Sequence, residues 1–173
     1  DFKIGVQLMW NCITPSLAVA KSVQADFTRC TALVGQTASP FGGVINADPL
    51  KVLEYRKKID AESVNLLAEI AGYHFHGGYD KEALLASAVM VRADAVEIMS
   101  KDEELNNRME QDIRGAYPDL PIILGGGTDV ASARNRLRNA DGALVGRCFE
   151  GENWGEGIDE SIVAAYMKEV RSI

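Results

Sequence analysis

Short apolar segments alternate with helix-length segments along nearly the whole of this 173-residue chain. Each helix-length segment is long enough to cross over a sheet and return to its edge, as the connections between parallel strands must. The near-continuous apolar runs at 121–124 and 142–145 are typical of strands that are covered on both faces. The alternation therefore predicts an α/β protein with a parallel sheet.

Six strands, each followed by a helix, account for the alternation. We expect the strands at Lys3–Asn11, 26–35, Ser63–Ala71, 95–100, 121–127 and 142–146. We expect the helices at 15–24, 48–59, 80–91, 103–117, 130–139 and 157–173, and a loop at 36–43. Asp48 and Pro49 suit the cap and the first position of the second helix.

The dipeptide Ala-Asp recurs before three of the expected strands, at Asp26, Asp94 and Asp141. A short acidic side chain there can close the turn between helix and strand by accepting hydrogen bonds from backbone N–H groups. Turn chemistry alone explains these aspartates. Their repetition nevertheless favours a repetitive architecture, of which the (β/α)8 TIM barrel is the commonest.

Glycines gather where the last two strands end. A glycine triplet follows the apolar run 121–124, and Gly146 ends the run that starts at Gly142. In (β/α)8 barrels the loops after the last strands often bind phosphate, and glycine lets backbone N–H groups approach an anion. We expect Thr128 or Asp129 to cap the next helix. The predicted phosphate-binding residues are Gly125, Gly126, Gly127, Thr128, Gly146 and Arg147. The alternative is that these glycines only permit tight turns.

Six units fall short of a complete barrel, which has eight and typically about 250 residues. Because the phosphate signature belongs to the last units, the shortfall is expected at the N-terminus. Lys3–Asn11 would then be the third strand, and the six units would be strands 3 to 8 of a single, N-terminally incomplete barrel domain. Made alone, such a chain would leave an unpaired strand edge and would associate.

Two carboxylates lie within apolar strands, Glu69 and Glu97. A buried carboxylate must be paired or have a raised pKa, and both conditions are usual for a general base. Arg29 is a plausible partner, and Asn11 is expected at the same strand ends. We take these four as candidate catalytic residues. A purely structural network of arginine and glutamates is an equal alternative.

The two histidines, His74 and His76, could ligate a metal with Glu69 or Glu97. Without a clearly placed third ligand, no metal site is predicted, and the sequence indicates no particular cofactor. The three cysteines have no Cys-x-x-Cys pairing and suit reduced thiols of a cytoplasmic protein.

The net charge of −7 argues against a nucleic-acid partner. No apolar run reaches the roughly 18 residues of a membrane span, so insertion into a membrane is not expected, although peripheral association stays open. A small phosphorylated ligand is the expected partner, and homo-oligomers stay open.

The order of motifs resembles the C-terminal two-thirds of the BtpA family, over nearly the whole chain. The segments that carry the resemblance are IGVQLMWN, AVAKSVQADFTRCTALVG, VLEYRKKIDAESVNLLAEIAGYHFH, VRADAVEIMS, DLPIILGGGTDV and NADGALVGRCFEGENWGEGID. The resemblance implies a TIM barrel whose first two βα units are absent here, and an association with photosystem I biogenesis. Trp10, Glu69, Ala71 and Tyr73 depart from the family pattern, whereas His74 is kept.

Two functions of different classes remain. The first is binding of, or chemistry on, a small phosphorylated metabolite. The second, which the resemblance implies, is a non-catalytic assembly factor for a membrane complex such as photosystem I. A fold hosts many functions and does not choose between them.

Overall fold

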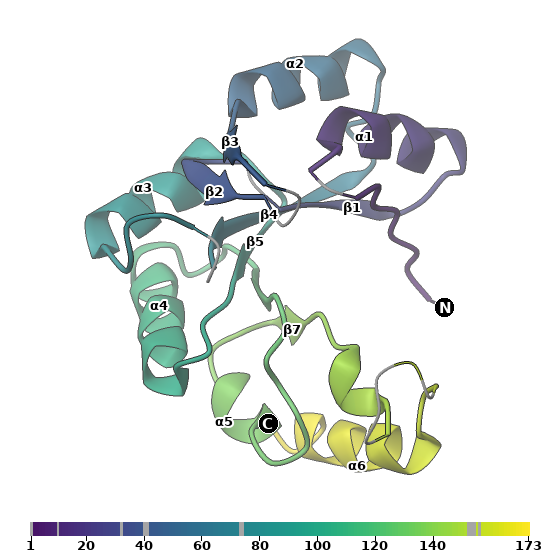
Figure 1. The fold of residues 1–173 in the computed structure, drawn as a ribbon, viewed down its shortest axis with the longest axis vertical. Helices are drawn as coiled ribbons and strands as arrows, with labels where there is room; N and C mark the ends of the chain where they lie inside the picture. Colours follow the sequence, from purple (N-terminus) through teal and green to yellow (C-terminus); the bar gives the residue numbers. More distant parts are fainter. Residues whose placement is uncertain are drawn as a thin grey trace. The chain divides into compact units, whose positions relative to one another are not determined.

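The chain was analysed as a computed structural model, which describes residues 2–9, 11–31, 33–39, 42–72, 75–151, 155 and 157–173. It consists of two compact units, Asp1–Glu97 and Ile98–Ile173. Figure 1 follows them along the chain, from purple to yellow. The expectation of a single domain stays a prediction.

The first unit is built on parallel strands in the order β1 (Phe27–Cys30), β4 (Asn65–Ala71) and β5 (Ala95–Ile98), the last residue of which belongs to the second unit. Phe27 lies opposite Asn65 in the parallel pair. The helices of this unit are α1 (Ile13–Ser22), α2 (Pro49–Lys58) and α3 (Lys81–Met90). Figure 1 shows α1 and α2 side by side, and α3 packs against β4.

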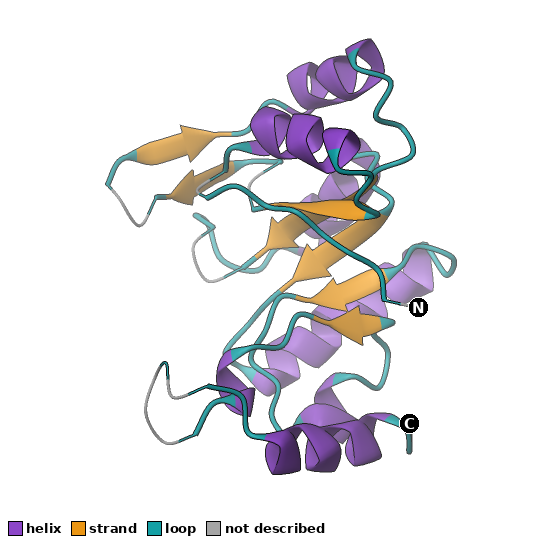
Figure 2. Ribbon diagram, turned by 90° about the vertical axis from the view of Figure 1, so that its right-hand side faces the viewer, coloured by secondary structure: helices purple, strands orange, loops and turns teal. Residues whose placement is uncertain are grey.

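The expected loop at 36–43 is in part a β-hairpin, which corrects the sequence analysis. β2 (Gln36–Ala38) pairs antiparallel with β3 (Val44–Asn46), and Figure 2 shows both as orange arrows. The β-branched residues in these short strands favour extended backbone. Gly42 and Gly43 have φ values of 95° and 79°, a region open to glycine, and reverse the chain.

The first strand was expected at Lys3–Asn11, but the described residues of this range form only one isolated bridge to β1, between Gly5 and Phe27. The Val6 N–H donates to the Phe27 carbonyl at 3.0 Å. Two residues later the Leu8 N–H donates instead to the Ser16 hydroxyl of α1 at 2.9 Å. The backbone therefore turns to the helix, and regular pairing with β1 does not continue.

The second unit contains the parallel pair β6 (Ile122–Leu124) and β7 (Gly142–Ala143). Its helices are α4 (Glu103–Ala116), α5 (Ala133–Arg136), the 3₁₀ turn η1 (Arg147–Phe149) and α6 (Glu160–Val170). The helix expected at 130–139 is thus only four residues long. Its N-cap is Ser132, because Asp129 closes the preceding turn by accepting from the Ser132 N–H and hydroxyl.

The repeated aspartates close their turns as predicted. Each carboxylate accepts the backbone N–H of a residue on the preceding strand or extended segment, and each aspartate N–H donates back to the carbonyl of that residue. The pairs are Asp26 with Ile4, Asp94 with Leu66, and Asp141 with Ile122. Each aspartate also pairs with a cation, namely Lys3, Arg56 and Arg114 respectively. These hydrogen bonds join neighbouring segments where the strands begin.

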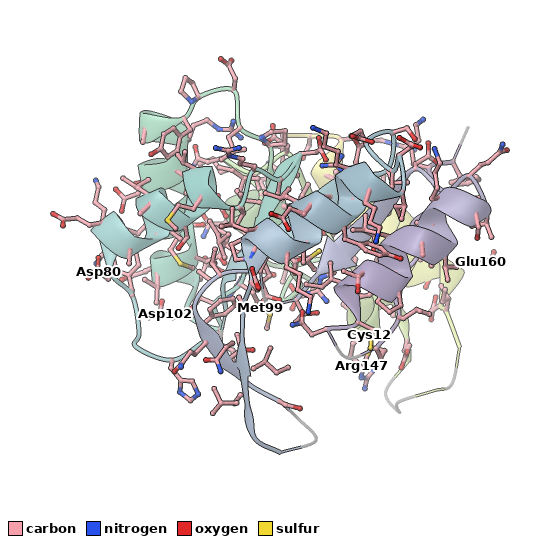
Figure 3. The ribbon with its side chains drawn as sticks, turned by 90° about the horizontal axis from the view of Figure 1, so that it is seen from above. Cys12, Asp80, Met99, Asp102, Arg147 and Glu160 are labelled. Carbon is pink, nitrogen blue, oxygen red and sulfur yellow. The ribbon has the colours of Figure 1, made fainter. Side chains whose placement is uncertain are left out.

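Aspartate side chains also cap the longer helices that follow α1. Asp48 accepts from the Lys51 N–H, which confirms the predicted start of α2. Asp80 and Asp102, both labelled in Figure 3, cap α3 and α4 in the same way. No helix within the described residues is long and apolar enough to cross a membrane.

Candidate functional site

One cavity of about 460 Å³ opens where β6 and β7 end. Its walls are the loop after β6 and the turn after β7. The lining residues are Gly125, Gly126, Gly127, Thr128, Asp129, Leu144, Val145, Gly146, Arg147 and Cys148. All six residues predicted to bind phosphate are among them. The structure therefore brings the six together, whereas phosphate binding itself stays a prediction.

Three consecutive backbone N–H groups of this cavity have no acceptor in the part of the chain that the structure describes. The Gly125 N–H donates to the Ile98 carbonyl of β5 at 2.9 Å, and the Asp129 N–H donates to the Ser132 hydroxyl at 3.1 Å. Between them, the N–H groups of Gly126, Gly127 and Thr128 donate to no described residue. Backbone donors in sequence are the groups from which proteins build anion sites.

Glycine is required at 126 and 127. Their φ values are 133° and 74°, which side-chain-bearing residues rarely adopt. A Cβ at Gly126 would meet one atom within 4 Å, the Leu144 carbonyl oxygen, which also lines the cavity. A Cβ at Gly127 would instead lie 3.3 Å from the Arg136 guanidinium. The backbone conformation therefore favours glycine at both positions, and at 127 the lack of a side chain also lets the loop pack on Arg136.

The charges at the cavity are Arg147 and Asp129. The Arg147 side chain, labelled in Figure 3, is 51% exposed and donates to the Gly151 carbonyl at 3.1 Å. Hydrogen bonds from Ser132 lower the pKa of Asp129, so its carboxylate stays ionised. An anion bound here would gain the attraction of Arg147 and meet some repulsion from Asp129.

Three of the four candidate catalytic residues meet in the first unit. The Arg29 Nε donates to Glu97 at 2.5 Å, and a second nitrogen contacts the other oxygen of the same carboxylate. That second nitrogen also donates to Glu69 at 3.1 Å. Neither glutamate side chain is exposed, whereas the Arg29 side chain is 24% exposed. The expected pairing of Arg29 with both carboxylates is thus present.

Two buried carboxylates share the Arg29 guanidinium, and each opposes ionisation of the other. Burial and, to a lesser extent, the nearby Glu97 charge raise the pKa of Glu69, and Arg29 lowers it only in part, so that it reaches about 9. Burial also raises the pKa of Glu97, although its hydrogen bonds with Arg29 act in the opposite direction. Because Glu97 holds the two-pronged contact, Glu69 is the carboxyl that keeps a proton.

The other candidates lie elsewhere. Asn11 is in the turn before α1 with a φ of 54°, rather than on a strand. His76 is exposed, and His74 lies outside the described residues. Among the described residues no group of three or more histidines, cysteines or acidic residues could hold a metal ion. The cysteines Cys12, Cys30 and Cys148 are all free.

Two residues beside the cavity were not predicted from the sequence. Tyr166 of α6 is 3% exposed, and its hydroxyl lies 2.8 Å from the Thr128 hydroxyl. Its ring meets Phe149 of η1 edge to face, with the ring centres 5.3 Å apart. The amphipathic pattern of the last helix indicates a buried face there, and it contains no signal for this partner.

A family model described as "BtpA family" matches residues 1–172. The chain belongs to the BtpA family. An uncharacterized protein of Archaeoglobus fulgidus is 29% identical to this BtpA-family chain, in an alignment that covers 83% of this chain. One from Pyrococcus abyssi is 30% identical over the same share. The chain spans 58% and 55% of those relatives, so little more than half of each.

Solved structures resemble the BtpA-family chain in fold. N-(5'-phosphoribosyl)anthranilate isomerase from Pyrococcus furiosus has a TM-score of 0.63 at 14% identity, over 95% of this chain and 71% of that one. Thiamine phosphate pyrophosphorylase from Pyrococcus furiosus has a TM-score of 0.56 at 16% identity, over 90% and 64%. The fold is therefore that of a TIM barrel, of which the chain carries a part.

Proposed function

We propose that this protein binds a small phosphorylated metabolite in the cavity between the β6 loop and the β7 turn. The observation that carries the proposal is the run of N–H groups at Gly126, Gly127 and Thr128, which have no acceptor among the described residues. They lie in the wall of a cavity that Arg147 also lines. Phosphate oxygens accept strongly from backbone N–H groups and from guanidinium groups, which suits this set of donors.

The size of the cavity supports a small ligand. At about 460 Å³ it is within the range of small-molecule pockets. The names of the two Pyrococcus furiosus proteins with a similar fold refer to phosphorylated compounds. These likenesses in fold are consistent with the proposal, and the evidence for it is the local arrangement of donors.

Arg147 and Asp129 set an expectation about affinity. Arg147 already donates to the Gly151 carbonyl and lies 3.7 Å from the Glu150 carboxylate, so part of its charge is balanced before an anion binds. The ionised Asp129 lies in the same lining and repels an anion. We therefore expect inorganic phosphate alone to bind more weakly than a phosphorylated metabolite, whose remaining atoms fill the rest of the cavity.

The cluster of Arg29, Glu69 and Glu97 is proposed to carry the catalytic chemistry. Arg29 is its partly exposed member, and the two glutamates are fully buried. We propose that Glu97 holds the Arg29 guanidinium in place and that Glu69 keeps a transferable proton. Asn11 is retained as a fourth candidate. A cytoplasmic location, suggested by the free cysteines, also stays a proposal.

Thermal unfolding with a panel of phosphosugars and nucleotides tests the binding. At least one compound is expected to raise the melting temperature, and Gly126→Val is expected to abolish the rise because its side chain would occupy the cavity. Gly77→Val is the matched control, because Gly77 has a φ of 106° and does not line the cavity.

Each variant must first melt cooperatively. If no phosphorylated compound at millimolar concentration stabilises the unmutated protein, the proposal is wrong and the cavity is only turn structure. The non-catalytic assembly role in photosystem I biogenesis would then be the remaining candidate.

A further inference from the structure

Tyr166 contacts both segments that carry the cavity lining, the loop after β6 and the turn after β7. Its hydroxyl lies 2.8 Å from the Thr128 hydroxyl, in the loop after β6. Its ring packs edge to face on Phe149, in the turn after β7, at an interplanar angle of 82°. Tyr166 itself is not in the lining. It therefore acts on the cavity through other residues.

We propose that Tyr166 is a positioning residue, which orients the Thr128 hydroxyl toward a phosphate group and holds the β7 turn in place. This inference rests on the proposed function. A threonine hydroxyl has one hydrogen to donate, and if that hydrogen goes to a phosphate oxygen, the contact with Tyr166 needs a hydrogen from the phenol. The phenol can supply it, and the threonine is then fixed as the donor to the ligand.

The environment of Tyr166 keeps the phenol in the donor state. Burial raises the pKa of Tyr166, and the hydrogen bond with Thr128 offsets this only in part. Thr128 is itself 4% exposed, so water competes little for the bond. Each of the two buried hydroxyls constrains the direction of the other's hydrogen bond, and removing either hydroxyl removes that constraint.

The second contact extends to the other wall. Phe149 ends η1, which begins at Arg147, and the Phe149 N–H donates to the Gly146 carbonyl at 2.9 Å. The Asp159 N–H, at the start of α6, donates to the Phe149 carbonyl at 2.7 Å. Helix α6 therefore fixes the turn that carries Gly146 and Arg147 by a backbone bond and by the Tyr166 ring.

A double-mutant cycle with inorganic phosphate tests the proposal, with affinity measured by calorimetry or by ³¹P NMR titration. Tyr166→Phe keeps the ring against Phe149 and removes only the hydroxyl. Thr128→Val keeps the shape and removes the donor. Each single change is expected to weaken binding by roughly three- to tenfold, the range for one hydrogen bond. The double variant is expected to bind no more weakly than Thr128→Val alone.

Tyr117→Phe makes the same chemical change outside the cavity lining and is expected to leave the affinity unchanged. If the two changes add, or if Tyr166→Phe lowers the melting temperature without altering phosphate affinity, Tyr166 is only structural and the inference is wrong. If the unmutated protein binds neither inorganic phosphate nor any phosphorylated compound of the panel, the proposed function and this inference are both wrong. If only a phosphorylated compound binds, the same cycle is measured with that compound. The three results are thus distinguishable.

Discussion

Two arginines in the first unit, Arg56 and Arg29, both bind carboxylates, but they differ in how many carboxylates they bind and in their other partners. Where the strands begin, Arg56 donates to the Asp94 carboxylate at 2.9 Å and to three backbone carbonyls of the turn before β4. Farther along the strands, Arg29 faces two buried carboxylates, Glu69 and Glu97. The first group pairs one guanidinium with one carboxylate, and the guanidinium also donates to backbone carbonyls. In the second, one guanidinium contacts two buried carboxylates.

The second unit repeats the contrast. At the start of its strands, Arg114 donates to the Asp141 carboxylate and to three carbonyls, as Arg56 does. Where β6 ends, the N–H groups from Gly126 to Thr128 donate to no described residue. In barrel enzymes the carboxyl ends of strands carry function and the amino ends carry stability, and the distribution of satisfied groups here follows that division.

Arg29→Met should give the largest effect, because it leaves two buried carboxylates without a cation. We expect a loss of about 3–5 kcal/mol in the free energy of unfolding, and a loss that grows as the pH rises. Urea unfolding at pH 6 and pH 8 measures it. Arg134→Met is the control. The Arg134 side chain pairs with Glu169 and is 63% exposed, so this change should cost under about 1 kcal/mol. If Arg29→Met and Arg134→Met lost the same free energy of unfolding, Arg29 would not be electrostatically coupled to Glu69 and Glu97.

Arg56→Met should cost less, about 2–3 kcal/mol, because it removes the donor of several buried carbonyls rather than the partner of two buried charges. These carbonyls do not titrate, so the loss should be the same at pH 6 and pH 8. The same urea experiment measures it. A loss that changed with pH as strongly as that of Arg29→Met would erase the difference between the two arginine groups.

Glu69→Gln should have the smallest effect near pH 6, about 1 kcal/mol or less, because the amide resembles the protonated acid. Folding raises the pKa of Glu69 from 4.5 to about 9, so its stabilising contribution is lost as the pH rises through that interval. The variant should therefore become the more stable protein toward pH 9. Unfolding measured from pH 5 to pH 9 tests this, with the exposed Glu82→Gln as control. Parallel pH profiles would mean that Glu69 is ionised in the folded state.

The sequence predicted the parallel α/β fold because apolar periodicity and aspartate caps are local signals. It missed the hairpin at β2 and β3, since Gly42 and Gly43 are as typical of a loop as of a tight turn. It also predicted a full helix at 130–139. There the hydrogen bonds between Asp129 and Ser132 compete with helical pairing, and α5 has only four residues.

The sequence indicated which residues to consider for the candidate site, but it did not indicate their protonation or their contacts. Glycines at strand ends and charged residues within apolar strands indicate where unusual chemistry lies, so the cavity lining and the Arg29 cluster could be named from the sequence. Which carboxyl keeps the proton depends on the geometry of one guanidinium between Glu69 and Glu97, which no local pattern encodes. The contact of Tyr166 with Thr128 joins residues 38 positions apart and has no sequence signal either.

The most direct measurement of the central claim is an NMR titration of the backbone amides with a phosphorylated ligand or inorganic phosphate. The account predicts that the amide resonances of Gly126, Gly127 and Thr128 shift most, together with that of Gly146 across the cavity. The amides where the strands begin, such as Leu66 and Ile122, already donate to carboxylates and should not move. Saturable shifts confined to other parts of the chain, with the glycine loop unchanged, would contradict it.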